Sequence, residues 1–303
     1  MIVVVTNKAA GPESAQSPTD RIKNAFGLLS PRVEIIEVNG NEITNTARDA
    51  VSGGATIVVA AGGDGTVNAV ATALVGTTTA LGVLPMGTLN HFAKDAGIPI
   101  DLAEAAALIT SGSQRAIDVA AVNETIFINN SSIGLYPLMV RDREKQRSRF
   151  KRSKWWAMVL ASATIFTRFP TFGVSMTLDG RTSSCRTPGV FIGNNVYKLD
   201  MINAGTREAL DAGLLSVYSV RTLSRWRTLG LAFSVLFSRL EESDVFDVAY
   251  TEECWLNTNR KNIDVSVDGE VMRMQTPLHY EIKKLSLQVI LPVQPMPLAP
   301  SKT

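Results

Sequence analysis

The strongest chemical signal in the sequence is a glycine-rich turn at residues 62–68, GGDGTVN, between a strand-like run and a helix-like pattern. Glycines let a backbone approach a ligand closely, and the start of the next helix offers unpaired N–H groups to a phosphate. A carboxylate beside phosphate is repelled unless it holds a metal or contacts a hydroxyl, so Asp64 is a candidate for such a role. The alternative is a tight turn with Asp64 in solvent. Thr66 is expected to cap the helix.

Two further turns share this arrangement. In the segment LPMGTLNHFAKDAGIP, residues 84–99, Gly87 and Thr88 precede a helix-like pattern, and TNKAAG at 6–11 follows the first strand-like run. Parallel neighbouring strands bring such turns together at the carboxyl edge of a sheet, where ligands bind in open α/β folds. The three turns therefore predict a single phosphate-binding pocket.

A second group of chemical side chains lies late in the chain, in IDVSVDGE at residues 263–270. Asp264, Asp268 and Glu270 alternate along a strand-like run, so we expect their side chains to share one face. Such carboxylates repel one another unless a cation or solvent separates them, and a carboxylate within hydrogen-bond reach can accept the proton of an alcohol. The alternative interpretation of VDGE is a hairpin turn with an exposed acidic pair.

Together, GGDGTVN, GTLNHFAKDAGIP and VDGE resemble the diacylglycerol kinase catalytic-domain family, which includes bacterial lipid kinases, sphingosine kinases and ceramide kinases. A GGDG turn also occurs in NAD kinases and phosphofructokinases, and the GTLN…GIP segment favours the lipid-kinase branch. The resemblance covers nearly the whole chain. It implies a kinase that uses ATP and Mg²⁺ to phosphorylate a lipid hydroxyl, in a cleft between a nucleotide-binding α/β domain and a β-sandwich.

The resemblance also implies roles for individual residues. It implies nucleotide contacts at Asn7, Lys8, Gly11, Gly62, Gly63, Asp64, Gly65, Thr66, Asn68, Gly87 and Thr88. It implies catalytic roles for Asp64, Asp268 and Glu270. The resemblance implies that one of the two late carboxylates is the general base and that the other helps to order magnesium. The motif does not settle which is which, and we take Asp268 as the base.

Some positions depart from the family pattern. Lys8 stands where the family usually has proline, and Ala69 where it usually has glutamate. The family's magnesium segment, DDG or NDG, corresponds to LDAGLL at residues 210–215, with Ala212 in place of the second carboxylate. Either Asp211 substitutes for the missing carboxylate, or this structural metal is absent. The predicted metal residues are Asp211, Leu214 and Glu270.

The elements that position these turns follow from the hydrophobic periodicity. Short β-branched runs alternate with helical patterns in the first 120 residues, as is typical of a parallel sheet with helices on both faces. We expect strands at 2–6, 33–38, 56–61 and 80–84. We expect helices at 19–29, 42–52, 66–75, 89–96 and 101–110. The last of these opens with Asp101, and Glu104 completes a capping-box spacing.

The second half of the chain consists mostly of strand-like runs, which indicates an antiparallel sandwich or barrel. We expect strands at 125–130, 172–178, 188–194, 214–220, 245–250, 263–267 and 285–291, and helices near 154–167 and 223–238. We therefore predict an α/β nucleotide-binding domain over residues 1–122 and a β-sandwich lipid-substrate domain over 123–284. The segment 285–303 is expected to return to the first domain.

Residues 141–154 (RDREKQRSRFKRSK) hold eight Lys or Arg and two Asp or Glu, a local charge of +6 in a chain of formal charge +2. Trp155 and Trp156 follow, and an apolar helical pattern continues from them. This composition suits an anionic membrane surface, so we predict docking through residues 141–156. The alternative is a solvated basic loop before a packed helix. Nucleic-acid binding is not indicated, because aromatic residues are not interleaved through the basic stretch.

Composition narrows the remaining function classes. Apolar residues make up 45% of the 303 residues and charged residues 19%, which excludes an intrinsically disordered chain. Cys185 and Cys254 cannot form a disulfide framework, and His91 and His279, the only histidines, argue against zinc or triad chemistry. No signal peptide or membrane-spanning run is visible. We expect a cytoplasmic protein that associates peripherally with membranes.

Two other functions remain open. An NAD kinase shares the GGDG turn, and a catalytically weak membrane-binding pseudokinase would retain the fold without turnover. The sequence does not distinguish diacylglycerol from ceramide or a sphingoid base as the acceptor lipid, and it does not indicate an oligomeric state.

Overall fold

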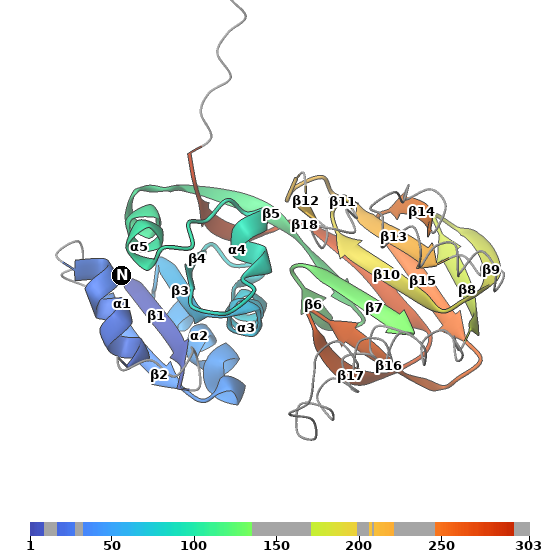
Figure 1. Ribbon diagram of the computed structural model, residues 1–303, viewed down its shortest axis with the longest axis horizontal. Coiled ribbons are helices and arrows are strands. Elements are labelled where there is room, and N and C mark those ends of the chain that lie inside the picture. The colour runs from blue at the N-terminus through green and yellow to red at the C-terminus, as the bar shows by residue number, and fades with distance from the viewer. Residues whose placement is uncertain are drawn as a thin grey trace, which may run out of the picture. The chain divides into compact units, whose positions relative to one another are not determined.

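The computed structural model describes residues 1–8, 17–27, 33–134, 171–198, 206–207, 209–220 and 246–293. The chain divides into two compact units, Met1–Ile117 with Leu285–Thr303, and Asp118–Lys284. Two strands, β5 (Ser113–Val122) and β18 (Leu278–Leu291), run from one unit into the other (Figure 1). The basic segment 141–156 and the helices expected near 154–167 and 223–238 lie outside the described residues.

The first unit is built on a parallel sheet with the strand order β2-β1-β3-β4, and the last part of β18 pairs beside β4. These strands are β1 (Ile2–Asn7), β2 (Val33–Val38), β3 (Ile57–Gly62) and β4 (Ala80–Pro85). Every residue of β4 is buried, as are the four central residues of β1. Burial on both faces of a strand is typical of a parallel sheet, so the predicted α/β class is confirmed.

Helices cover this sheet in pairs. They are α1 (Pro18–Phe26), α2 (Ile43–Ser52), α3 (Asp64–Leu74), α4 (His91–Asp95) and α5 (Leu102–Ser111), with a 3₁₀ turn η2 (Gly40–Glu42) before α2. α1 packs against α5, and α2 packs against α3. Within the described ranges, none of the helices combines the length and the apolar character needed to cross a bilayer.

Helix starts follow the sequence in one case and depart from it in another. The Asp101 carboxylate accepts hydrogen bonds from the N–H groups of Ala103 and Glu104, at 2.9 and 3.0 Å, so Asp101 caps α5 as predicted. The prediction that Thr66 caps α3 is wrong, because Gly63 is the N-cap. α3 therefore begins two residues before the expected cap.

The second unit consists of antiparallel strands. One sheet has the order β14-β13-β10-β7-β16-β17, and the other runs from the first part of β18 through β15 and β8 to β9. β6 pairs with β5, and β11 and β12 form a short ribbon. The bounds are β6 (Thr125–Phe127), β7 (Asn130–Gly134), β8 (Phe172–Leu178), β9 (Arg181–Thr187), β10 (Gly189–Asn194), β11 (Tyr197–Lys198), β12 (Thr206–Arg207), β13 (Leu215–Val220), β14 (Phe246–Thr251), β15 (Glu253–Thr258), β16 (Asn262–Val267) and β17 (Glu270–Gln275).

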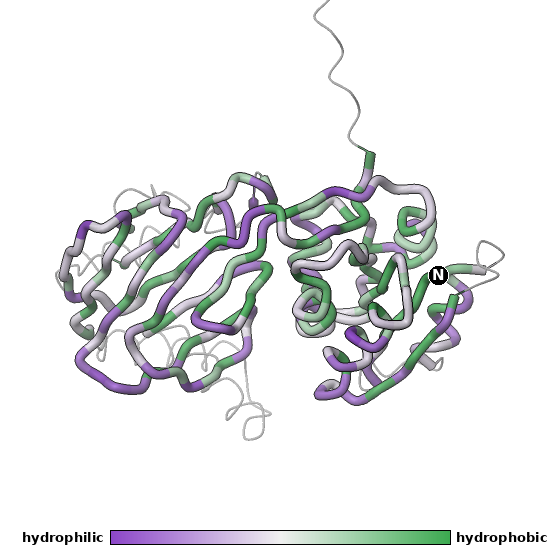
Figure 2. The backbone as a smooth tube through the Cα atoms, turned by 180° about the vertical axis from the view of Figure 1, so that it is seen from behind, coloured by the Kyte–Doolittle hydropathy of each residue, from purple (hydrophilic) through white to green (hydrophobic). Residues whose placement is uncertain are grey.

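The core of the second unit lies between these two sheets. Residues from both sheets share one buried cluster, for example Ile133 and Val265 from one sheet and Leu256 and Tyr280 from the other. Hydrophobic and hydrophilic segments alternate along the strands of this unit (Figure 2). That alternation is expected of antiparallel strands with one face in a core, and it confirms the antiparallel second half of the predicted fold.

Candidate functional site

Three turns of the first unit lie side by side at one edge of the parallel sheet. β1, β3 and β4 are parallel neighbours in register. The residues at and just after their carboxyl ends, at 7–8, 63–66 and 86–90, therefore share the carboxyl edge of the sheet. The Met86 N–H donates to the Gly62 carbonyl at 2.9 Å, so the second and third turns touch directly.

Two glycines of these turns cannot be replaced without displacing neighbouring atoms. A Cβ at Gly87 would lie 2.5 Å from the Gly63 Cα and 2.8 Å from Asn90 Oδ1. A Cβ at Gly62 would lie 2.3 Å from Thr66 Oγ1. Asn90 itself adopts φ +51°, accepts from the Gly87 N–H at 3.0 Å and donates to the Gly87 carbonyl at 2.9 Å. Backbone contact between the two turns is thus part of the fold.

The start of α3 offers the chemistry that an anion needs. The first turn of a helix leaves its N–H groups without acceptors inside the helix and carries the positive end of the dipole. The first intrahelical bond runs from the Val67 N–H to the Gly63 carbonyl. Gly65 is exposed there, while the Thr66 side chain is buried. An anion placed against Gly65 would therefore meet backbone N–H groups rather than side chains.

The carboxylate of Asp64 links the glycine turn to the helix that follows the next turn. Asp64 Oδ1 accepts from the Phe92 N–H at 3.2 Å, and Oδ2 lies 3.6 Å from Nδ1 of His91. The Asp64 side chain is 17% exposed and that of His91 49%. Asp64 therefore joins the start of α3 to the start of α4.

This pair shifts the titration of both groups. Burial alone would raise the pKa of Asp64, but the neighbouring His91 imidazole and the hydrogen bond from the Phe92 N–H outweigh it, and the pKa is lowered. The neighbouring Asp64 carboxylate raises the pKa of His91 above its ordinary value. A charged pair is therefore favoured at this position in mildly acidic solution.

The remaining predicted nucleotide residues of the first unit vary in exposure. Lys8 and Thr88 are exposed, and Asn7 and Asn68 are partly buried. Gly11 lies outside the described residues. Asn7 is the last residue of β1 and Lys8 follows it, Asn68 lies on α3, and Thr88 lies in the turn after β4. All four thus belong to the carboxyl edge of the sheet or to the first turns of α3.

The late acidic motif is a two-residue hairpin turn in the second unit. β16 ends at Val267, and β17 begins at its cross-strand partner Glu270. Asp268 and Gly269 form the turn with φ +46° and +88°, the left-handed values that an Asp-Gly turn of this kind requires. The chain reverses between Asp264 and Glu270, so the prediction that Asp264, Asp268 and Glu270 share one strand face is wrong.

The Asp268 carboxylate is held by backbone N–H groups of another segment. Its Oδ2 accepts from the Ile128 N–H at 2.9 Å, and its Oδ1 accepts from those of Asn129 and Asn130 at 2.9 and 3.0 Å. The Asp268 N–H donates to the Asn130 carbonyl at 2.9 Å. Glu270, in contrast, is exposed at the start of β17. The two neighbouring carboxylates thus have different surroundings.

A buried carboxylate that the sequence reasoning missed lies next to the expected metal segment. Asp118, 1% exposed, accepts from the Gly213 N–H at 2.6 Å, and its own N–H donates to the Leu210 carbonyl at 2.8 Å. Asp118 therefore fastens the loop that contains Asp211 to β5. The signal was a single Asp within the otherwise apolar strand run AIDVAAV.

No group of three or more His, Cys, Asp or Glu suited to a metal occurs among the residues that the structure describes. Asp211 and Glu270 are both exposed, and Leu214 is partly buried. A metal site at Asp211, Leu214 and Glu270 therefore stays a prediction.

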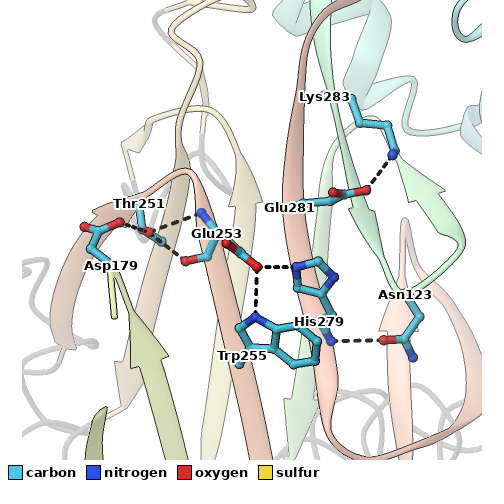
Figure 3. Close-up of polar contacts among 8 residues, drawn as sticks. All are labelled: Asn123, Asp179, Thr251, Glu253, Trp255, His279, Glu281 and Lys283. Carbon is cyan, nitrogen blue, oxygen red and sulfur yellow. Dashed lines mark hydrogen bonds and ion pairs between the residues drawn. The ribbon is translucent and has the colours of Figure 1, made fainter. Parts of the chain in front are cut away.

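A separate polar cluster of the second unit contains none of the predicted site residues. The Glu253 carboxylate accepts from Trp255 Nε1 at 2.9 Å and lies 2.7 Å from His279 Nε2 (Figure 3). The rings of Trp255 and His279 stack, with their centroids 4.1 Å apart. Hydrogen bonds from Trp255 and then His279 lower the pKa of Glu253. These contacts connect β15 to β18. They give His279 a structural role in the second unit.

Comparison with known proteins gives a family model and several relatives that match part of the chain. Residues 1–122 match the family model described as the diacylglycerol kinase catalytic domain. The protein named "Probable lipid kinase YegS-like" from Klebsiella pneumoniae (strain 342) is 55% identical over 80 residues, 25% of this chain and 27% of that protein. "Probable lipid kinase YegS" from Escherichia fergusonii is 49% identical over 138 residues, 44% of this chain and 45% of that protein. The matches thus span less than half the length of these curated relatives.

A solved structure resembles the fold over nearly its full length. The crystal structure of a diacylglycerol kinase from Bacillus anthracis str. Sterne matches with a TM-score of 0.72 and 24% sequence identity. The match covers 96% of this chain and 96% of that chain. At this identity, the similarity shows the shared fold.

Proposed function

Because residues 1–122 match the model of the diacylglycerol kinase catalytic domain, we propose that the chain belongs to this family and is an ATP-dependent kinase that phosphorylates a lipid hydroxyl. The observation that carries this proposal is the meeting of the GGDG turn with the turn after β4, at the carboxyl edge of the sheet. A nucleotide needs several backbone N–H groups close together, and this edge supplies them.

The proposed nucleotide site uses the glycine turns of the first unit. The N–H groups at the start of α3 would bind phosphate oxygens. Glycine at positions 62, 63 and 87 allows the backbone of these turns to pack closely. Asn7, Lys8 and Thr88 flank these turns and are proposed to contact the rest of the nucleotide, together with Gly11. Asp64 is proposed to act here through its link to α4.

The proposed chemistry is direct transfer of the γ-phosphoryl group. The lipid hydroxyl oxygen forms a bond to the γ-phosphorus, the bond from that phosphorus to the bridging β–γ oxygen breaks, and the hydroxyl proton passes to a carboxylate. The products are ADP and the lipid phosphate. We assign the carboxylate role to Asp268, whose orientation is fixed by three backbone N–H groups. A transition state of this kind depends more on positioning than on basicity.

Magnesium is the proposed metal cofactor. Mg²⁺ is usually bound through one or two carboxylates together with substrate phosphates and water. The exposed carboxylate of Glu270 is an oxygen donor of the kind that Mg²⁺ binds, and the ion would arrive with ATP. When bound, it would neutralise phosphate charge. Glu270 is its proposed carboxylate, while Asp211 and Leu214 remain the proposed residues of a separate structural site.

The proposed acceptor is a membrane lipid, of the diacylglycerol type or a ceramide or sphingoid base. Both named relatives carry "lipid kinase" in their names, which supports the lipid class but not one lipid. The charge of the segment 141–156 supports contact with an anionic membrane surface, and peripheral association of a cytoplasmic protein is part of the same proposal.

The decisive experiment is incubation of the purified protein with γ-labelled ATP, Mg²⁺ and a mixed membrane-lipid extract, followed by identification of the labelled product. We expect one labelled lipid phosphate, and we expect it to disappear with Asp268→Asn. NAD is assayed in parallel, and liposome binding is measured for both proteins. A labelled NADP product would replace the lipid-kinase proposal with an NAD kinase. Liposome binding without any labelled product would indicate a pseudokinase.

A further inference from the structure

The segment 128–130 is held from two sides by groups of opposite charge. On one side, the Asp268 carboxylate accepts hydrogen bonds from all three backbone N–H groups of this segment, at 2.9–3.0 Å. On the other side, Arg207 Nη1 donates to the Ile128 carbonyl at 2.6 Å, and Nη2 donates to Asn129 Oδ1 at 3.2 Å. Arg207 lies on β12, about 60 residues before Asp268 in the sequence.

A single peptide group connects the two charges. The carbonyl of the Ile128–Asn129 peptide accepts from the Arg207 guanidinium, and the N–H of the same peptide donates to Asp268 Oδ1. Hydrogen bonds in such a chain polarise one another, so a cation on the carbonyl strengthens the N–H as a donor. The positive charge of Arg207 therefore acts on the Asp268 carboxylate through one peptide.

The guanidinium is fixed in this position. Arg207 is 7% exposed, and its Cζ lies 5.6 Å from the ring centroid of Tyr197, its cross-strand partner in the β11–β12 ribbon. Asn194 Nδ2 donates to the same Ile128 carbonyl at 3.0 Å. A planar, buried fork with bonds to two acceptors sets the orientation of the peptide more tightly than a lysine ammonium can.

We propose that Arg207 is a positioning residue for the phosphoryl-transfer reaction, acting on Asp268 through the Ile128–Asn129 peptide. This inference rests on the proposed function, in which Asp268 receives the hydroxyl proton. Without the guanidinium, the peptide can tilt, and the Asp268 carboxylate moves with the N–H groups that hold it. The effect belongs to the chemical step and not to nucleotide binding.

The test compares Arg207→Met and Arg207→Lys with Arg273→Met. Arg273, on β17, is 67% exposed and contacts Asp264 at 3.4 Å, so it is a matched control on the hairpin that carries Asp268. We expect Arg207→Met to lower kcat about 100-fold while the KM for ATP changes less than about twofold. Arg207→Lys, which keeps the charge, should be intermediate, and the control should match the unmodified protein. Activity is expressed per folded molecule, measured by circular dichroism.

A thermal double-mutant cycle between Arg207→Met and Asp268→Asn separates this inference from the proposed function. We expect the loss of Tm in the double variant to be smaller than the sum of the single losses, because the two residues act on one peptide. Additive losses would overturn the inference even if the kinase is active. An unchanged kcat in Arg207→Met and Arg207→Lys would also overturn it. If the unmodified protein phosphorylates no lipid, the proposed function fails, while the cycle still decides whether the two residues are coupled.

Discussion

Asp64 shows how a residue expected to act on a ligand can also connect two elements of the fold. Its carboxylate accepts from the Phe92 N–H and lies 3.6 Å from His91. The pKa of Asp64 is lowered, so its contribution to folding stability is present at pH values above its ordinary pKa of 3.8 and is lost as the pH falls through its pKa in the folded protein. The pKa of His91 is raised, so its contribution to folding stability is present at pH values below its ordinary pKa of 6.5 and is lost as the pH rises through its pKa in the folded protein.

Replacement of His91 should therefore have a pH-dependent effect on stability. We expect His91→Gln to lower Tm at about pH 5.5, where both groups are charged, and to have a much smaller effect at about pH 9, where the imidazole is neutral. Thermal melts of both proteins at the two pH values check this. Equal Tm differences at both pH values would mean that the pair carries no charge-dependent stabilisation. The effect is small because the His91 side chain is about half exposed.

The two late carboxylates should respond differently to loss of charge. Asp268→Asn places an amide NH₂ against backbone N–H groups that now donate to an oxygen, and we expect a loss of about 1–3 kcal/mol in unfolding free energy. Glu270→Gln changes an exposed side chain and should stay within about 0.5 kcal/mol. Urea denaturation of the two variants gives both numbers. A larger loss for Glu270→Gln would contradict the described contacts.

At the level of elements, the contact between the turns after β3 and β4 requires glycine at position 87. Gly87→Ala would press a methyl group against the Gly63 backbone, and we expect a loss of about 1–3 kcal/mol in stability. Because the proposed phosphate site uses the same turns, ATP should also bind at least about tenfold more weakly. Thermal melts and calorimetric titration with ATP measure the two effects.

Gly173→Ala is the matched control for this substitution. Gly173 lies on β8 of the second unit, and among the residues that the structure describes a Cβ there would have only Asn259 Nδ2 within 4 Å, at 3.9 Å. We expect this variant to keep its Tm within about 2–4 °C and to bind ATP normally. A similar loss of ATP affinity in both variants would argue against a special role for the Gly63–Gly87 contact.

The sequence predicted those elements that are marked by a pronounced hydrophobic pattern. The strands of the first unit are buried on both faces, so their β-branched runs are continuous and easily recognised. β9, with the sequence RTSSCRT, was missed because every residue except Thr187 is exposed and no apolar alternation marks it. Its pairing with β8, and not its composition, makes it a strand.

Site residues were predictable where a local motif creates the geometry. The glycine turn after β3 lies where the sequence predicted it, because the chain needs a tight turn between a strand and the helix that directly follows it. The shared face of Asp264 and Glu270 failed because alternation along the sequence does not show where a two-residue turn reverses the chain. Arg207 and Asp118 act through contacts with residues about 80–95 positions away, which no local pattern reveals.

At the level of the whole molecule, the first unit is assembled from both ends of the described chain. Leu287, Val289 and Leu291 of β18 are buried, and Val289 pairs in parallel with Leu81 of β4. The Gly76 N–H also donates to the Ser286 carbonyl at 2.8 Å. The last strand is therefore part of the first unit's core and not an accessory.

A polypeptide of residues 1–122 alone should consequently fail to form a cooperative fold, although it contains the whole family match. Residues 1–117 joined through a flexible Gly/Ser linker to 285–293 should fold, because the linker restores the missing strand beside β4. Thermal denaturation followed by circular dichroism distinguishes the two. A sharp transition for 1–122 alone would show that the last strand is dispensable.

The passage of β5 and β18 between the units also has a consequence for biosynthesis. Domains usually fold in the order in which they leave the ribosome, from the amino-terminal side onward. Here Met1–Ile117 cannot complete its fold until Leu285–Leu291 has been translated, because the edge of β4 stays unpaired until then. The segment inserted between, Asp118–Lys284, is complete earlier, so the portion translated first is the last to mature.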